Sequence, residues 1–426
     1  MRNSSSSEIS VVSWKSVNPI IIIGMLFFIF GFVTWLNGTL IPFLKISCEL
    51  SNFQAYLVTF AFYISYLVMA PPSSVVLHKV GFKNGIALGL VVMAIGSVVF
   101  IPAALTRTFG LFLTGLFIQG AGLALLQTAS NPYVTLIGSR ESAAKRISIM
   151  GICNKVAGVI SPLVLGAIVL KGANQIVEQI KIVSGPEKEI FLNSLAHRVI
   201  LPYVSMAVVL TGLSLMVRYA HLPEIETDTD EESFTANGNH KTNLLHFPHL
   251  ILGFITLFFY VGVEVMAGDT IVLYGQSQGI ALDIARKFTA FTLASMVLGY
   301  IIGIIAIPKF IRQERALAVS AIVGFFLVLC AILFSGYASV ACIALLGLAN
   351  ALMWPAIWPL AIADLGKFTK AGSALLVMGI AGGATIPLLY GFLADHWGSQ
   401  KLAYWIMVPI YVFIFYFATI GHKVSK

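Results

Sequence analysis

The sequence has 426 residues, of which 58% are hydrophobic and only 10% are charged, and its net charge is +8. Soluble domains carry about 25% charged residues, so this chain has too few charges to coat a soluble fold of its size. The composition therefore excludes an ordinary soluble protein and indicates one whose outer face is solvated by a lipid bilayer.

The first 18 residues are polar, and a long apolar run begins near Pro19. This run is longer than the apolar core of a secretory signal peptide, which has about 7–15 residues. No small-residue cleavage pattern leading into a soluble domain follows it. We therefore expect a retained first span behind a cytoplasmic tail at residues 1–18.

Apolar stretches that are long enough to cross a bilayer as helices, about 20 residues each, recur along the whole chain. Twelve are predicted, at residues 19–43, 54–76, 84–105, 109–137, 144–170, 199–219, 248–274, 286–308, 315–335, 338–363, 371–394 and 401–420. The predicted fold class is an all-α membrane protein with twelve transmembrane helices.

An acidic stretch with almost no apolar side chains, residues 221–243, separates the sixth span from the seventh. It indicates a solvated cytoplasmic linker at 221–246 between a six-helix bundle at 19–220 and another at 247–421, with a short tail at 422–426. Placing both termini in the cytoplasm puts most Lys and Arg residues of the connections on the cytoplasmic side, as the positive-inside rule requires.

Short sequence echoes relate the two predicted bundles. Met150-Gly151-Ile152 in span five recurs as Met378-Gly379-Ile380 in span eleven, and Asn131-Pro132 in span four is matched by Trp358-Pro359 in span ten. Several echoes in matching span order favour a duplication over chance similarity, as in transporters built from two related halves. We therefore predict two pseudo-symmetric bundles.

Three charged residues fall inside predicted spans rather than in loops: Lys155 in span five, and Glu264 and Asp269 in span seven. A charge at membrane depth is costly and usually functional. Two interpretations stay open. Lys155 forms a structural ion pair with Glu264 or Asp269 that locks the bundles together, or this pair forms and breaks during transport or one of the acids binds a cation.

Uncharged polar and aromatic side chains recur in corresponding spans of both bundles, which predicts a shared cavity near the middle of the membrane. The candidates for substrate binding are Asn37, Gln127, Asn131, Asn154, Tyr260, Asn350, Trp354 and Trp358. Amides can donate to and accept from hydroxyl groups, and aromatic faces cover the C–H side of a sugar ring. The alternative is ordinary hydrogen bonding between helices for the amides and ordinary packing for the tryptophans.

Signatures of enzymes and of ATP-driven pumps are missing from the sequence: it has no GxxxxGK[ST], HExxH or CxxC motif and no nucleophile elbow. The four cysteines show no paired spacing, and three lie in apolar runs, so neither a disulfide framework nor a metal site is expected. We expect a carrier driven by a gradient, with no catalytic residues, no cofactor and no nucleic-acid partner, that works as a monomer in the bilayer.

Several segments resemble the fucose:proton symporter family of the major facilitator superfamily, and the resemblance covers nearly the whole chain in the right order. The segments are LLQTASNPYVTLIG (125–138), FGFVTWLNGTLIPFL (30–44), NFQAYLVTFAFYISY (52–66), FFYVGVEVMAGD (258–269) and NALMWP (350–355). The bacterial glucose/galactose transporter branch is the most similar. The resemblance implies a carrier in the bacterial cytoplasmic membrane that imports a hexose with a coupling cation by a rocker-switch motion.

The resemblance also implies that Asn37, Gln127, Asn131, Asn154 and Asn350 line the cavity. Fucose carriers have coupling acids where this chain has Gly38 and Gln127, and neither of these groups can titrate.

The glucose/galactose branch shares the glutamine and includes sodium-coupled members, so sodium near Asp269 and Thr270, with Glu264 as a further oxygen donor, is one expectation. Proton coupling through Glu264 or Asp269, uniport without coupling, and transport of fucose or another monosaccharide are alternatives. A drug or metabolite exporter of the same fold is disfavoured because the predicted cavity is rich in amides.

Overall fold

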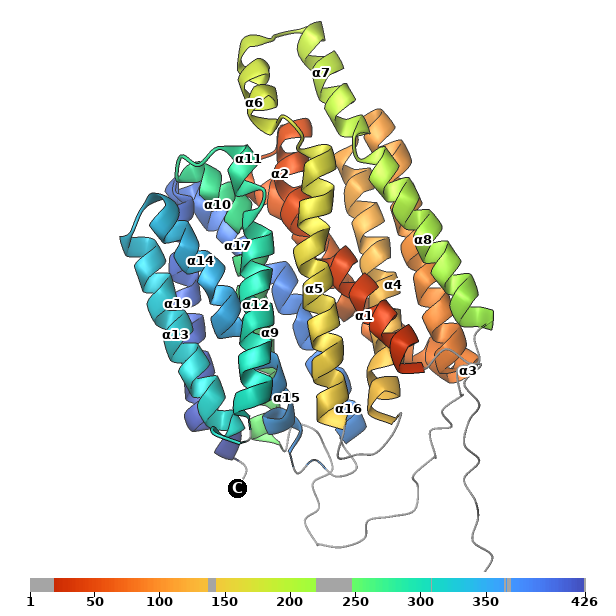
Figure 1. The fold of residues 1–426 in the computed structure, drawn as a ribbon, viewed down its shortest axis with the longest axis vertical. Helices are drawn as coiled ribbons and strands as arrows, with labels where there is room; N and C mark the ends of the chain where they lie inside the picture. The colour runs from red at the N-terminus through yellow and green to blue at the C-terminus, as the bar shows by residue number, and fades with distance from the viewer. Residues whose placement is uncertain are drawn as a thin grey trace, which may run out of the picture.

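The computed structural model describes residues 19–136, 143–219, 247–307, 309–363, 365 and 369–424. All regular elements in these ranges are helices (Figure 1), and twelve candidate membrane spans lie among them. The prediction of an all-α protein with twelve spans is confirmed. The predicted N-terminal tail and linker lie outside the described residues, so the proposed domain boundaries stay predictions.

The first half of the chain, residues 19–219, forms six spans and one helical hairpin. Its helices are α1 (Pro19–Thr34), α2 (Asn37–Ser47), α3 (Asn52–Thr106), α4 (Phe109–Leu136), α5 (Ala143–Val169), α6 (Ala173–Ile182), α7 (Pro186–His197) and α8 (Ile200–Tyr219). Helix α3 comprises two spans that reverse direction at Gly81, whose φ of 77° and ψ of 169° are accessible to glycine because it lacks a Cβ atom.

The second half, residues 247–424, forms the other six spans. Its helices are α9 (Pro248–Asp269), α10 (Ile271–Ser277), α11 (Leu282–Ala285), α12 (Phe288–Ala306), α13 (Gln313–Leu333), α14 (Gly336–Asn350), α15 (Met353–Ile362), α16 (Thr369–Met378), α17 (Gly382–Trp397), α18 (Gln400–Ala403) and α19 (Met407–Thr419), with 3₁₀ turns η4 (Gly379–Ala381), η5 (Tyr404–Ile406) and η6 (Gly421–Lys423).

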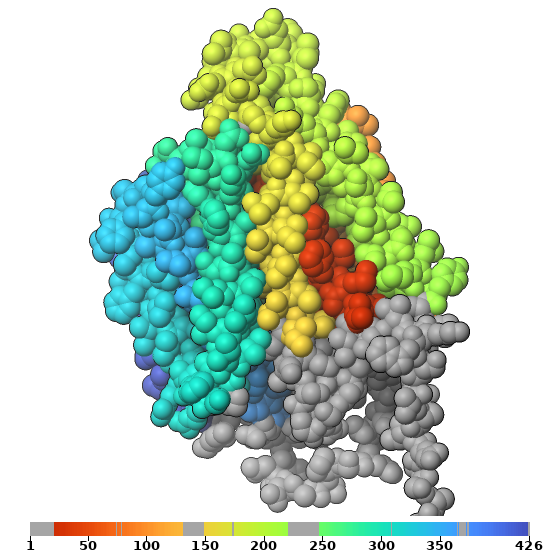
Figure 2. Space-filling view, viewed as in Figure 1, coloured from red at the N-terminus to blue at the C-terminus, as the bar shows by residue number. Residues whose placement is uncertain are grey.

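The contact surface between the two halves is called the seam below. Helix α3 packs along α17 and α5 packs along α12, and Figure 2 shows α5 lying directly against α12. The end of the molecule that carries α6 and α7 is called the hairpin end, and the end at which the chain terminus is marked in Figure 1 is called the terminus end.

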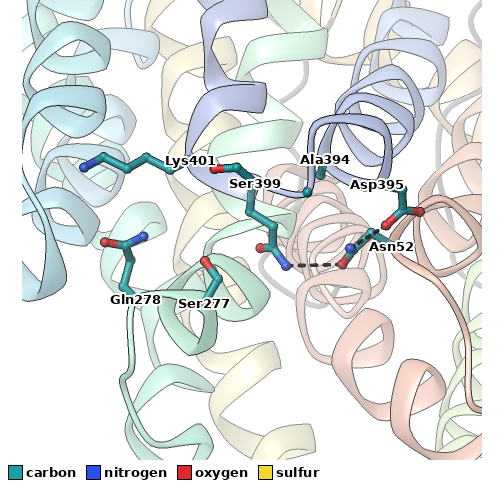
Figure 3. A pocket seen from close by; sticks show the side chains of 9 residues that line it. Asn52, Ser277, Gln278, Ala394, Asp395, Ser399 and Lys401 are labelled. Carbon is teal, nitrogen blue, oxygen red and sulfur yellow. Dashed lines mark hydrogen bonds between the residues drawn. The ribbon is translucent and has the colours of Figure 1, made fainter.

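Two side chains from the second half cap helix ends of the first half at the hairpin end. Asp395 Oδ2 accepts from the backbone N–H of Phe53 at 2.8 Å, and Asp395 Oδ1 accepts from Asn52 Nδ2 at 2.6 Å, at the N-terminus of α3 (Figure 3). Arg286 Nη1 donates to the carbonyl oxygens of Gly166 at 2.7 Å and Leu170 at 3.2 Å, at the C-terminus of α5. An acid at a helix N-terminus and a base at a helix C-terminus both complement the helix dipole, so both contacts stabilise closure of the hairpin end.

Other polar contacts extend this closure. Gln400 Nε2 donates to Asn52 Oδ1 at 3.2 Å, and Lys45 donates to the same oxygen. Within the first half, Arg107 forms an ion pair with Glu189 at 2.7 Å, which holds α7 against the end of α3.

Replacing Asp395 with alanine is expected to loosen the hairpin end, because losing a helix cap costs about 1 kcal/mol. An energy of this size corresponds to about a fivefold change in an open-to-closed ratio. The measurement is the rate at which a membrane-impermeant maleimide labels a cysteine introduced at Ala394, which is 2% exposed, in a protein whose native cysteines are replaced by serine. Glu178→Ala, which removes an exposed acid from α6, is the control. An unchanged labelling rate in Asp395→Ala would show that the cap does not hold this end closed.

Candidate substrate and ion site

A buried ion pair joins the two halves at the seam. Lys155 Nζ on α5 lies 2.7 Å from Glu264 Oε1 on α9, and each side chain is only 10% exposed. Removing charges from water costs several kcal/mol per ion, which a close partner of opposite sign offsets. Of the two partners that the sequence left open for Lys155, the structure therefore places Glu264 against it.

Trp35 supports this ion pair from the first half. It lies at the break between α1 and α2, and Lys155 Nζ is 4.6 Å from the centroid of its ring, within the range of a cation–π contact. The ring fits between two glycines: a Cβ atom on Gly158 of α5 or Gly268 of α9 would approach it to 2.5 or 2.4 Å. Leu293 and Met296 of α12, in the second half, pack with Trp35 in a small apolar cluster.

Asp269 forms a different polar contact across the seam. Its side chain is completely buried, and its Oδ2 accepts a hydrogen bond from Thr59 Oγ1 of α3 at 3.0 Å. Its Oδ1 has no hydrogen-bond partner within the part of the chain that the structure describes. The next residue, Thr270, donates to the Met266 carbonyl at 2.7 Å and shares a hydrogen bond with the Tyr404 hydroxyl at 2.6 Å.

One face of α3 carries hydroxyl groups, of which one contacts Asp269 and another contacts the predicted amide Gln127 on α4. The face carries Tyr56, Thr59, Tyr63 and Tyr66 at helical spacing. The rings of Tyr63 and Tyr66 stack at 6.2 Å, and the Tyr66 hydroxyl accepts from Gln127 Nε2 at 3.1 Å.

Sequence reasoning missed Thr59, Tyr63 and Tyr66 as members of the site, although their spacing marks a polar face on an otherwise apolar span.

Aromatic hydroxyl groups surround Glu264. Tyr260, Tyr300 and Tyr411, from three different helices, all lie within electrostatic range of its carboxylate. Tyr411 also donates to Asn350 Oδ1 at 2.9 Å. These contacts bring the predicted residues Tyr260 and Asn350 close to the ion pair.

The two predicted tryptophans of span ten stack on each other. The ring centroids of Trp354 and Trp358 are 5.4 Å apart with an interplanar angle of 25°, as their spacing of four residues on α15 favours. Trp354 also lies 6.4 Å from the Tyr260 ring, which places this aromatic pair beside α9.

The remaining predicted amides differ in their surroundings. Asn154 Nδ2 donates to the Phe27 carbonyl at 3.4 Å, which is an ordinary contact between α5 and α1. Asn37 is buried, and neither its side-chain nitrogen nor its side-chain oxygen has a hydrogen-bond partner among the described residues. The side-chain nitrogen of Asn350 also has no partner among these residues. The Asn131 side chain lies outside the described part. Buried amides without partners have hydrogen-bonding capacity that a polar ligand can use.

Two hollows open away from these residues. One, of about 330 Å³ at the hairpin end, is bordered by Asn52, Asp395 and Gln278 (Figure 3). The other, of about 360 Å³, is apolar and lies where α1 is set back between α5 and α8 (Figure 2). Neither hollow is lined by the predicted sugar-binding residues, so the central cavity stays a prediction.

Twelve spans in two packed halves, with buried charges and amides along the seam, define a membrane carrier of the kind that binds its solute between two related bundles. The family model described as Major Facilitator Superfamily matches residues 23–375. The chain belongs to the major facilitator superfamily, and the predicted fold of two six-helix bundles is confirmed.

Individual relatives indicate which transporters within this superfamily the chain is similar to. A glucose/galactose transporter of Brucella abortus is 33% identical over 403 residues, which cover 94% of this chain and 93% of that protein. The L-fucose-proton symporter of Escherichia coli is 28% identical over 407 residues, covering 94% and 92% of the two chains. The relatives are transporters, which agrees with the expectation that the chain is not an enzyme.

Solved structures agree with this assignment. The crystal structure of the fucose symporter FucP in the outward conformation superposes with a TM-score of 0.70 at 28% identity, covering 94% of this chain and 98% of that one. A D-xylose-proton symporter structure, with a TM-score of 0.66 at 17% identity and coverage of 96% and 98%, shares the fold.

Removing one partner of the Lys155–Glu264 pair is expected to destabilise the protein more than removing both. A single alanine variant leaves one buried charge without its partner, which costs about 3–5 kcal/mol. The measurement is the Tm in detergent of Lys155→Ala, Glu264→Ala and the double variant, read as a double-mutant cycle. The Arg312–Glu314 pair, in which Arg312 is 68% exposed, is the matched control and should change stability by about 0–1 kcal/mol. Additive losses at Lys155 and Glu264 would contradict coupling between them.

Proposed function

We propose that the chain imports a hexose of the glucose/galactose class together with a cation, by alternately opening the hairpin end and the terminus end. The observation that carries the proposal is the polar seam, where the Lys155–Glu264 pair joins the two halves, with Trp35 against Lys155 and Tyr260 beside Glu264. The 33% identity with a glucose/galactose transporter over most of both chains supports the hexose.

The proposed substrate site uses the amides as hydrogen-bonding groups and the aromatic rings as a platform. The amides are Asn37, Gln127, Asn131, Asn154 and Asn350, and the rings are Tyr260, Trp354 and Trp358. Unpartnered amide atoms on Asn37 and Asn350 offer donors and acceptors to sugar hydroxyls. The stacked tryptophans offer a flat face to the C–H side of the ring.

The membrane orientation is part of the proposal. We assign the terminus end to the cytoplasm and the hairpin end to the outside of a bacterial cytoplasmic membrane, because the positive-inside rule favours cytoplasmic termini. In this orientation the caps at Asp395 and Arg286 close the outer side. The protein then works as a monomer, since both halves of the site come from one chain.

We propose a proton as the coupling ion. The expected sodium position near Asp269 and Thr270 is poorly supplied with free oxygen atoms, because the Thr270 hydroxyl already bonds Met266 and Tyr404. No group of three or more His, Cys, Asp or Glu side chains suited to a metal ion occurs among the described residues. The similarity to the L-fucose-proton symporter of Escherichia coli also supports a proton as the coupling ion.

Lys155 has a mechanistic role in this scheme as well as a structural one. Its pair with Glu264 crosses the seam, so any motion that separates α5 from α9 must break it. A bound hexose can compensate by offering hydroxyl groups to the separated charges, since hydrogen bonds to charged groups are worth about 1.5–3 kcal/mol.

Gln127→Ala and Asn154→Ala are each expected to lower hexose uptake about tenfold or more, because one lost hydrogen bond of about 1.5 kcal/mol corresponds to this factor. The measurement is uptake of radiolabelled D-glucose, D-galactose and L-fucose into proteoliposomes under imposed proton and sodium gradients. Gln119→Ala is the matched control, since Gln119 lies on the same helix and bonds Ser97 within the first half.

Normal uptake by both amide variants would remove the proposed site. Preference for L-fucose would change the assigned substrate, and uptake that no gradient concentrates would indicate a uniporter.

A further inference from the structure

Asp269 differs from the other buried acid of the seam in having no cationic partner. Glu264 pairs with Lys155 at 2.7 Å, whereas Asp269 receives one hydrogen bond, from the neutral hydroxyl of Thr59. No Lys, Arg or His side chain in the described part of the chain bonds to Asp269. Two basic groups at the hairpin end have other partners: Arg286 bonds the carbonyl oxygens of α5 and Lys45 bonds Asn52.

The groups that face Asp269 from neighbouring helices are uncharged hydroxyls and aromatic rings. Tyr56 and Tyr63 of α3 lie within electrostatic range of its carboxylate. On the second half, Thr289 and Thr292 of α12 donate to the carbonyl oxygens of Gly268 and Ala267. Two other acids act on the same tyrosines: Glu264, which pairs with Lys155, interacts with Tyr63, and Asp395 at the hairpin end interacts with Tyr56.

A completely buried carboxylate with an unpartnered oxygen is strongly disfavoured in its charged form, because burial removes hydration that nothing replaces. Uptake of a proton removes the charge. The closed arrangement of the seam around Asp269 therefore fits the neutral acid.

The position of Asp269 ties its exposure to the closure of the hairpin end. Asn52, Tyr56 and Thr59 follow one another along α3 from that end, and they contact Asp395, Tyr390 and Asp269 of the second half in the same order. Separation of α3 from α17 and α9, starting at the hairpin end, must break these contacts in turn and admit water to the carboxylate. Closure seals Asp269 from that side again.

We propose that Asp269 is the proton-carrying group of this carrier and that Glu264 is not. With the hairpin end open, a hydronium ion from outside transfers its proton to a carboxylate oxygen of Asp269 and leaves as water, and the neutral side chain permits closure around the bound hexose. With the terminus end open, the O–H bond breaks, the proton passes to water there, and the hexose leaves. This assignment rests on the proposed hexose symport and names the group that couples it.

The test compares the full-length protein with Asp269→Asn in proteoliposomes, using D-glucose and D-galactose as probes. The amide is close in shape to the protonated acid but cannot release a proton. Asp269→Asn is expected to lose accumulation of hexose driven by an acidic outside, and to lose the alkalinisation of the outer medium that accompanies uptake. It should keep exchange of internal for external hexose at equal pH, because exchange needs only the loaded carrier. Glu178→Gln, which removes an exposed carboxylate on α6, is expected to behave like the parent.

Two further measurements test the role of Asp269 if Asp269→Asn also loses hexose exchange. Asp269→Glu, which restores a titratable group, should recover accumulation driven by the pH gradient. In purified protein, hexose affinity measured by tryptophan fluorescence should depend on pH in the parent and become independent of pH in Asp269→Asn.

The outcomes separate this assignment from the proposed function. A parent protein that neither takes up nor exchanges hexose overturns the proposed function. If the parent protein and Asp269→Asn accumulate hexose equally under a pH gradient, only the proposed role of Asp269 is overturned. Accumulation driven by sodium and insensitive to the pH gradient, or pH-dependent hexose affinity that persists in Asp269→Asn, also overturns that role.

Discussion

The Lys155–Glu264 ion pair is the contact on which the arrangement of the seam depends. Each charge lies in a span where it would be costly alone, and each comes from a different half of the chain. Pairing satisfies both charges only when the Lys155 and Glu264 side chains meet across the seam, and the cation–π contact with Trp35 brings the break between α1 and α2 to the same point. The glycines on either side of that ring allow this close approach.

The different roles that we propose for the two acids of α9 rest on their neighbours rather than on their depth in the fold. Both are almost completely buried and lie five residues apart, but Glu264 pairs with Lys155, whereas Asp269 accepts a hydrogen bond from the neutral hydroxyl of Thr59. The charge of Glu264 is thus offset by a cation, and Asp269 has no such partner among the described residues. In the proposed scheme, α9 presents a fixed charge toward the sugar and a proton-carrying group toward the hairpin end.

The sequence predicted the architecture well because hydropathy alone distinguishes twelve spans, and it located Lys155, Glu264 and Asp269 because charges are rare at membrane depth. It did not predict which acid meets Lys155, since that depends on how α5 and α9 rotate against each other. Thr59 and Tyr63 were missed because single hydroxyls resemble ordinary span residues. The cap between Asp395 and Asn52 joins residues 343 positions apart, and no local pattern indicates it. The sharp turn at Gly81, between the second and third predicted spans, depends on its positive φ of 77°, which hydropathy does not indicate.

A structure of the protein with bound D-glucose or D-galactose tests most directly whether the seam is the transport site. We expect the sugar between the halves, in contact with Gln127 and Asn350, its ring facing Trp354, and the Lys155–Glu264 pair at its edge. A sugar bound outside the seam, or a seam that stays closed and empty while the protein transports hexose, would contradict this arrangement.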